Sequence, residues 1–458
     1  MGLTRAIGEF ASAIEFADIP RPAVAIVADG FTDCVGVLFA GLDEPVARVV
    51  ARTIAGQSRG GGAAAFVNLT AAAPDLALLY GAAAHALDYD DTGLSSHPSA
   101  VLVPAILAEA HEMPVDGRTM IAAYVAGYEI WAELIRRDAD GHHGKGWHPT
   151  AVFGAVAAAG AAAVMRGLDA DLASHAIGIA TSFAGGVVAN FGSMMKPFQA
   201  GRAAQSGLLA ARWAQAGLTA SPDPIEHHLG LLRAISPRGA VDVDSAPQLG
   251  TAWRILSSGL NFKLYPICYA AHRAVDAMLQ LRRDNGILAD DISRVDVELG
   301  DSQAAMLRNH APRSSNEARF SLEFAIAAAA IAGRCGRSEL ESGFVQRRDV
   351  QNFFAKVSAT TTTDRNADEQ TLSPFDRLSV QTNKGLFVSE PVRFPRGHFK
   401  NPIDADALAA KFNDCAAGHL SSAQARRLFT TLQNLPAVTS IADLTTDPTL
   451  ANASARVG

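Results

Sequence analysis

The sequence predicts a mainly α-helical protein, in which a smaller α+β domain is inserted into a large all-helical domain. Of the 458 residues, 49% are hydrophobic and only 7% are aromatic. Such an alanine-dominated composition favours close-packed helices, because alanine has the highest helix propensity and lets helix axes approach. Apolar residues recur at spacings of three and four up to about residue 262, and they begin to alternate with polar residues after Leu281.

The helical spacing is clearest in six segments of the first part of the chain. These are residues 24–39, 100–110, 120–135, 151–165, 170–183 and 203–216. Asp169 precedes one of them and is a typical N-cap residue. We therefore expect residues 1–269 to form the main part of the helical domain.

Residues 270–395 have a different pattern and predict the smaller α+β domain. Residues 292–299 alternate apolar and polar side chains, as a half-buried strand does, and 350–360 and 378–380 are also strand-like. A short helix is expected at 320–332. Amphipathic spacing returns at 404–428, so residues 396–458 should rejoin the helical domain, with a polar and partly disordered end after residue 436.

Charge and cysteine content exclude several classes of protein. The net charge is −7 and no basic block is present, which argues against a nucleic-acid partner. The four cysteines lack metal-ligand spacing, so no metal site is expected, and scattered thiols fit a reducing cytoplasm. No signal peptide is evident, and the apolar runs 151–165 and 325–332 are too short to cross a bilayer. We expect a cytoplasmic protein with no membrane partner.

A polar cluster between apolar segments is the strongest indication of chemistry. Asp88, Asp90, Asp91 and Thr92 are followed closely by His97, and apolar helical segments precede and follow them. Burying so many polar groups is costly unless each finds a partner or a ligand. The alternative is a solvated helix end whose carboxylates interact with the helix dipole. If the cluster were helical, Asp88 would share a face with Asp91 or Thr92.

Two histidines and two lysines lie in comparable settings. His97 and His148 each precede a proline and a buried helix, and helix N-termini attract anions. Lys196 lies in an apolar stretch, where it contacts a substrate or extends to the surface by snorkelling. Lys263 lies where the two domains join, which is a favoured place for ligand sites. The candidate substrate-binding residues are Thr92, Arg202, Tyr265 and His272.

Cofactor motifs are missing from the sequence. It has no GxGxxG after a strand, no P-loop and no HExxH. A set of His, Asp, Lys and Tyr side chains without such motifs indicates proton transfer on a small anion, without a cofactor.

The order of eight short segments resembles the MmgE/PrpD family along nearly the whole chain. They are residues 33–41, 85–99, 123–129, 146–150, 196–201, 263–266, 317–321 and 395–402. The resemblance implies a helical domain with an inserted α+β lid domain, a homodimer, and cofactor-free chemistry. It also implies a small di- or tricarboxylate substrate that reacts beside a carboxylate.

The resemblance also assigns residues. The active-site positions of the decarboxylase branch match Asp88, Thr92, His97, His148, Lys196 and Lys263. The tyrosine of that branch aligns with Phe324, which counts against decarboxylation. We therefore expect a cofactor-independent epimerase of an iminodisuccinate-like dicarboxylate. The alternatives are a dehydratase of a 2-methylcitrate-like acid, a cis-aconitate-type decarboxylase, and a non-catalytic carboxylate-binding protein.

Overall fold

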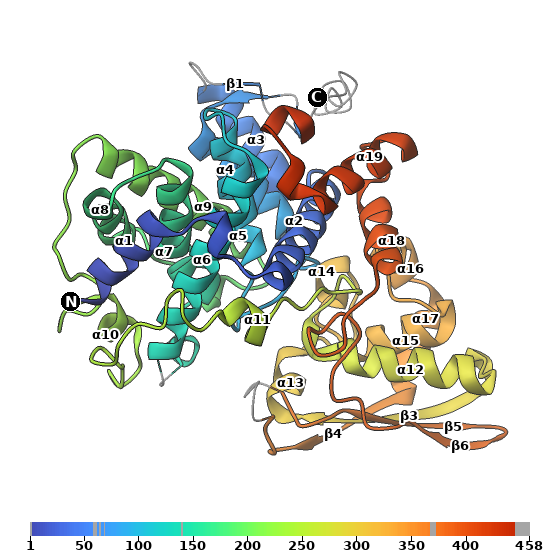
Figure 1. The fold of residues 1–458 in the computed structure, drawn as a ribbon. Coiled ribbons are helices and arrows are strands. Elements are labelled where there is room, and N and C mark those ends of the chain that lie inside the picture. Colours follow the sequence, from blue (N-terminus) through green and yellow to red (C-terminus); the bar gives the residue numbers. More distant parts are fainter. Residues whose placement is uncertain are drawn as a thin grey trace. The chain divides into compact units, whose positions relative to one another are not determined.

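The computed structural model divides the chain into two compact units. It describes residues 2–57, 62–63, 66–67, 69–138, 141–366 and 372–444. The first unit comprises residues 1–260 and 404–458, and the second comprises residues 261–403. The junctions thus lie nine residues before, and eight residues after, the boundaries expected from the sequence pattern. Each unit is described by itself below (Figure 1).

The described part of the first unit is almost entirely helical, as the apolar spacing predicts. Its helices are α1 (Leu3–Ala13), α2 (Arg21–Gly41), α3 (Pro45–Gln57), α4 (Ala73–Ala84), α5 (Ser99–Ala110), α6 (Gly117–Arg137), α7 (Pro149–Met165), α8 (Ala170–Thr181), α9 (Met195–Gln215), α10 (Leu231–Ile235), α11 (Arg254–Ser258), α18 (Ala405–Ala416) and α19 (Ser422–Gln433). A short antiparallel pair, β1 (Gly62–Ala63) and β2 (Thr70–Ala71), joins α3 to α4. Asp169 caps α8, as expected, by accepting the Leu172 amide.

Helix α9 packs against both α4 and α7, and these three helices frame the polar cluster. Glycine permits the close approach of α4 and α9. A Cβ atom on Gly81 would lie 2.6 Å from the Cα of Gly201, and a Cβ on Gly201 would lie 2.1 Å from the carbonyl oxygen of Leu78. Because no larger residue fits either position without moving a backbone, the end of α4 is held beside the first turns of α9.

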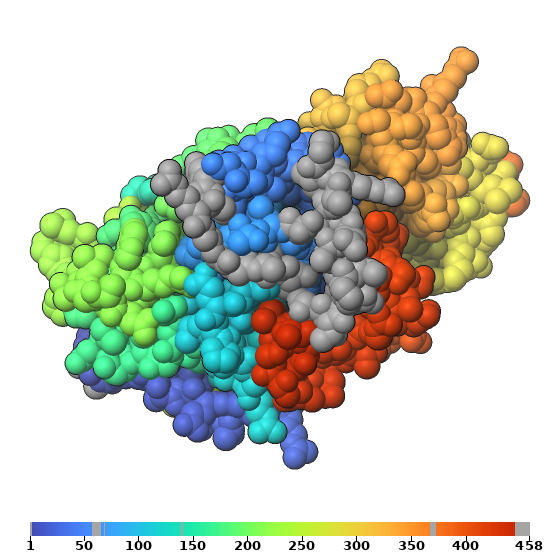
Figure 2. Space-filling model, turned by 90° about the horizontal axis from the view of Figure 1, so that it is seen from above, coloured from blue at the N-terminus to red at the C-terminus, as the bar shows by residue number. Residues whose placement is uncertain are grey.

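The C-terminal helices return to the first unit, as the amphipathic pattern of residues 404–428 indicates. Two helices form there rather than one, because Gly418 adopts a φ of 90° and Ser421 begins α19 with a capping box. Both helices pack on α2, and the short turn Leu435–Ala437 contacts α6. Figure 2 shows this red segment beside the cyan part of the chain.

By length and composition, α2 could cross a membrane, which the sequence interpretation did not recognise. However, 78% of its most apolar window is buried inside the structure. A core helix of a folded unit passes the same test, so this helix is weak evidence for a membrane span.

The second unit has a four-stranded sheet with the strand order β4-β3-β5-β6. The strands are β3 (Ile292–Gly300), β4 (Val357–Thr362), β5 (Arg377–Thr382) and β6 (Gly385–Val388). β3 pairs in parallel with β4, with Val295 opposite Val357, and the remaining pairs are antiparallel. The helices of this unit are α12 (His272–Asn285), α13 (Asp301–Met306), α14 (Ser315–Ala318), α15 (Leu322–Ala332), α16 (Ser342–Val345) and α17 (Arg348–Phe353).

Helices α12 and α15 lie over one face of the sheet and form the core of the second unit with it (Figure 1). The strand expected at 350–360 is wrong in its first half, which forms α17. Val350, Phe353 and Phe354 are buried at helical spacings of three and four, so this stretch buries its apolar groups as a helix. The expectation of a disordered end falls mainly on residues 445–458, which lie outside the described residues.

Candidate active site

The polar cluster lies on the loop between α4 and α5, not on a helix. Asp88, Leu94 and Ser95 all adopt positive φ values, of 51°, 52° and 55°. Such left-handed backbone is unfavourable for residues other than glycine and is maintained only where the surroundings impose it. Gly93 and Ser96 pair with each other through two backbone hydrogen bonds of 2.9 Å, which tightens the loop. The helical arrangement of Asp88 with Asp91 or Thr92 is therefore wrong.

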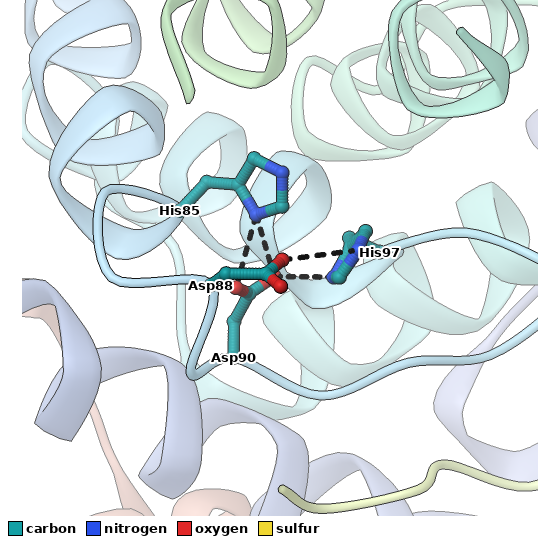
Figure 3. Close-up of side chains that lie close together, drawn as sticks. All are labelled: His85, Asp88, Asp90 and His97. Carbon is teal, nitrogen blue, oxygen red and sulfur yellow. Dashed lines mark hydrogen bonds and ion pairs between the residues drawn. The ribbon is translucent and has the colours of Figure 1, made fainter. Parts of the chain in front are cut away.

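Asp90 is a buried carboxylate that holds two imidazole rings (Figure 3). Its oxygens lie 3.0 and 3.1 Å from Nδ1 of His85, and 2.9 Å from Nδ1 of His97. The two rings are 4.3 Å apart between centroids. Burial opposes the charge on Asp90, but the two histidines outweigh it and hold its pKa well below the usual range. Burial also lowers the pKa of His85 to about 4.

Asp88 connects the loop to α9. Its carboxylate lies 2.5 Å from Nζ of Lys196 and 3.8 Å from Nε2 of His97. Lys196 is 9% exposed and lies over the ring of Phe191, with 5.4 Å between Nζ and the ring centroid. The snorkelling alternative for Lys196 is therefore wrong, because the ammonium group faces a buried carboxylate rather than solvent. The alternative that the loop is a solvated helix end is also wrong, because the carboxylate of Asp88 is buried.

His148 precedes the first turn of α7 and adds a third imidazole. Its ring centroid lies 6.3 Å from that of His85, and the edge of Phe191 packs against it at 4.8 Å. Burial is the main cause that lowers its pKa to about 2, and the positive charge of Lys196 contributes. The structure brings His97 and His148 together around His85.

The low pKa of His148 makes a prediction about stability and pH. Its folded-state value lies below the ordinary 6.5, so its stabilising contribution is complete above pH 6.5 and is lost as the pH falls. A His148→Gln variant has no imidazole at this position, so it does not lose this stability as the pH falls. Between pH 7 and pH 5 its free energy of unfolding should therefore rise by about 2 kcal/mol relative to the native protein. Denaturant titrations of both proteins at the two pH values measure this difference, and a constant difference would contradict the neutral buried state of His148.

Helix α18, where the C-terminal part of the chain rejoins the first unit, contacts the loop that carries the site. Nζ of Lys411 on α18 lies 2.5 Å from Asp33 on α2 and donates a 2.8 Å hydrogen bond to the carbonyl oxygen of Tyr89. Burial raises the pKa of Asp33 to about 6. Burial, together with the negative charge of Asp33, raises the pKa of Asp91 well above its usual range. The pKa values of the two adjacent carboxyl groups are therefore shifted in opposite directions, that of Asp90 downwards and that of Asp91 upwards.

The remaining candidates in the first unit differ in their placement. Oγ1 of Thr92 is buried without a hydrogen-bond partner among the described residues, so it is available to a ligand. Arg202 is exposed on α9 and donates a 2.6 Å hydrogen bond to Oε1 of Gln205. The structure does not bring Arg202 to the cluster, and its role as a substrate-binding residue is not supported by its position.

Lys263, Tyr265 and His272 belong to the second unit. The hydroxyl of Tyr265 donates a 2.5 Å hydrogen bond to Asp276, and the rings of Tyr265 and His272 pack edge to face at 5.0 Å. His272 is fully buried, with Nε2 3.3 Å from the carbonyl oxygen of Ile267. Tyr265 and His272 therefore pack in the core of this unit, and their role as substrate-binding residues stays a prediction. Phe324 is also a core residue there and packs against Phe344.

Four side chains of metal-ligand type meet in the cluster, which their sequence spacing did not indicate. One possible ligand atom from each of His85, Asp88, Asp90 and His97 lies within 4.8 Å of the others. These atoms already have partners: Asp90 accepts from both imidazoles, and Asp88 accepts from Lys196. The hydrogen bonds do not engage every ligand-type atom of the set, because Nε2 of His85 is buried without a hydrogen-bond partner among the described residues.

Four residues of the site were not assigned a role from the sequence. His85 and Asp90 lie inside the recognised cluster, but only the fold shows that they pair. Gln199, which contacts His148, lies in the segment 196–201 that carried part of the resemblance. Phe191 has no sequence signal, because an isolated aromatic residue near a helix start is ordinary.

The fold and the cluster together define a mainly helical protein with a buried set of imidazole, carboxylate and ammonium groups suited to proton transfer. Models of two domains match nearly the entire chain. The MmgE/PrpD N-terminal domain matches residues 5–244, and the MmgE/PrpD C-terminal domain matches residues 265–436. The chain therefore belongs to the MmgE/PrpD family, which confirms the resemblance inferred from the motifs.

The individual relatives are cis-aconitate decarboxylases. The chain is 26% identical to that of Mus musculus over 374 residues, which cover 78% of this chain and 75% of the relative. It is 25% identical to that of Homo sapiens over 386 residues, covering 81% and 78%. It is 25% identical to that of Aspergillus terreus over 374 residues, covering 76% and 75%. These relatives favour the decarboxylase alternative over the epimerase that the sequence interpretation ranked first.

Proposed function

We propose that this protein is a cofactor-independent lyase that decarboxylates a small tricarboxylate of the cis-aconitate type. The observation that carries the proposal is the Asp88–Lys196 pair beside His97, within a chain whose relatives are named for this reaction. The ammonium group of Lys196 is held in place before any substrate binds. Such preorganised charge stabilises a developing anion without reorganisation during the reaction.

The chemistry requires one bond to break and one proton to be added. Cleavage of a carbon–carboxylate bond releases carbon dioxide and leaves an electron pair on the remaining carbon skeleton. Lys196 compensates the charge of this carbanion, and His97 is placed to supply the proton through Nε2, because its Nδ1 faces Asp90. Asp90 orients the imidazole, as carboxylates do in other His–carboxylate pairs.

Epimerisation is the second candidate, and one residue favours it. Phe324 lacks the hydroxyl of the tyrosine with which the decarboxylase branch aligns at this position. An epimerase removes a proton beside a carboxylate and returns one to the opposite face, so it needs two acid–base groups. His97 and His148 would be the two acid–base groups that act on a dicarboxylate such as iminodisuccinate.

One assay separates the candidate reactions. The protein is incubated in D₂O with cis-aconitate, a 2-methylcitrate-like hydroxy acid or a chiral imino-linked dicarboxylate, and carbon dioxide and proton NMR spectra are followed. We expect carbon dioxide and a singly deuterated product from cis-aconitate. Deuterium exchange with inversion and no carbon dioxide would establish the epimerase. A new alkene from the hydroxy acid would establish a dehydratase, and binding without exchange would establish a carboxylate-binding protein.

Removal of divalent ions is expected to leave the reaction unchanged, since the ligand-type atoms of the cluster are hydrogen-bonded to one another. Dialysis against a chelator, followed by the same assay, measures this. Readdition of magnesium, manganese or zinc should also have no effect. A rate that falls on dialysis and returns with one particular ion would contradict the prediction.

We also propose a homodimer, as the family resemblance implies. Light scattering coupled to size-exclusion chromatography measures the mass in solution. A mass near twice 47.9 kDa is the expected result.

A further inference from the structure

Gln199 is a buried amide that touches an imidazole of the candidate site. It lies on α9, one turn after Lys196, and is 5% exposed. Its Oε1 is 2.6 Å from Nδ1 of His148, and its Nε2 donates a 3.3 Å hydrogen bond to the carbonyl oxygen of Val187. Both polar atoms of the side chain are therefore engaged, one by the site and one by the backbone.

The backbone contact fixes which way the amide faces. A carbonyl oxygen only accepts hydrogen bonds, so the group next to Val187 must be the NH₂ of Gln199. The segment that presents this carbonyl is itself held in place: Trp147 forms a bridge with Val187, and the amide of His148 donates to the carbonyl oxygen of Gly186 at 2.9 Å. A Cβ atom on Gly186 would approach Oε1 of Gln199 to 3.0 Å, so the glycine leaves room for the amide.

The fixed amide then determines the proton position on His148. Because Oε1 is an acceptor, Nδ1 of His148 must carry the hydrogen, which leaves Nε2 as an unprotonated acceptor. We infer that Gln199 is a positioning residue that selects this tautomer, so that His148 offers the substrate a hydrogen-bond acceptor at Nε2. The effect of Gln199 on catalysis rests on the proposed function, whereas the tautomer of His148 does not.

The surroundings of His148 favour the neutral ring. Lys196, His85 and His97 are the titratable groups that face it, and Phe191 covers its edge. Any positive charge on these groups repels a second proton on His148. His148 and His97 are thereby given different tasks. Nδ1 of His97 faces the carboxylate of Asp90, whereas Nδ1 of His148 faces a neutral amide, so that His148 accepts a hydrogen bond at Nε2.

The tautomer can be observed without substrate. The full-length protein is labelled with ¹⁵N-histidine, and the His148 signals are assigned by their loss in His148→Gln. We expect the native protein to show a hydrogen on Nδ1 and a bare Nε2 throughout pH 5 to 9. Gln199→Leu keeps the volume but removes the acceptor, so the signals should shift towards the Nε2–H form. We expect kcat to fall by roughly tenfold or more, with KM little changed.

Gln199→Glu provides an independent arm, which also applies if the leucine variant does not fold. A carboxylate next to Nδ1 keeps the tautomer but stabilises the protonated ring, so kcat/KM should acquire a loss on the acidic side that the native protein lacks. Gln205→Leu is the matched control. Gln205 lies on the same helix and bonds Asp75 and Arg202, so its substitution should change neither the His148 signals nor kcat.

The outcomes separate the tautomer from the reaction. An Nε2–H signal in the native protein, or unchanged His148 signals in Gln199→Leu, would overturn the role of Gln199. An Nδ1–H signal in a native protein that releases no carbon dioxide would support the role of Gln199 and refute the proposed decarboxylation.

Discussion

Replacement of Lys196 by methionine is expected to lower kcat/KM by about 10² or more, since one positioned charge at a reacting centre contributes on the order of 3 kcal/mol. Methionine nearly keeps the side-chain volume of lysine, so the loss of kcat/KM measures the contribution of the charge. Nζ of Lys196 lies 2.5 Å from Asp88, and no other carboxylate of the described part of the chain forms an ion pair with it. Steady-state kinetics with cis-aconitate measures the effect.

The same substitution removes the lysine partner of a buried carboxylate, which costs stability. Asp88 is 8% exposed, and breaking a buried ion pair typically costs about 3–5 kcal/mol. The double variant Asp88→Asn/Lys196→Met removes both charges and should recover most of this loss in a denaturant titration, while its activity stays low. If the double variant regains activity as well as stability, Lys196 serves the fold and not the chemistry.

Replacement of Asp90 by asparagine is expected to lower kcat/KM by about 10² or more. Asp90 accepts from Nδ1 of His85 and is 2.9 Å from Nδ1 of His97, and an amide offers one acceptor where the carboxylate offers two. At least one imidazole must then turn or change its tautomer. The substitution also removes the negative charge that faces the His97 ring.

A matched control for Asp90 lies in the same unit. Asp138 accepts from Nδ1 of His142 at 2.6 Å and is likewise buried, but neither residue belongs to the cluster. Asp138→Asn should therefore lower the melting temperature to a similar extent and leave kcat/KM close to that of the native protein. Equal losses of activity in the two variants would show that any disturbed His–Asp pair weakens the protein, and would remove the special role of Asp90.

The helices of the first unit could be predicted because their signals are local. Alanine-rich segments with apolar spacings of three and four specify a helix and its buried side within a few turns. The strand β3 was predicted for the same reason, from alternation within nine residues. The stretch 350–360 was mispredicted, because short apolar runs fit a strand or a helix equally well until packing selects one.

The candidate site could be predicted only as a set of residue types. Acidic, imidazole and ammonium groups in apolar surroundings indicate proton chemistry wherever they meet, so Asp88, His97, His148 and Lys196 were recognised. The residues with which they interact in the fold were not recognised. Tyr265, His272 and Arg202 have equally suitable side chains, but their neighbours in the fold give two of them core positions and one an exposed position.

The sequence by itself determined the family, the helical first unit, the α+β second unit and the chemical character of the site. The tertiary structure alone decided that Asp90 holds two imidazoles, that Lys196 pairs with Asp88 across 108 residues of sequence, and that Gln199 backs His148. The physical reason is the distance along the sequence over which each kind of interaction acts. Helix and strand preferences arise between residues a few positions apart, whereas a hydrogen bond between distant segments exists only once the close packing of α4, α7 and α9 has brought them together.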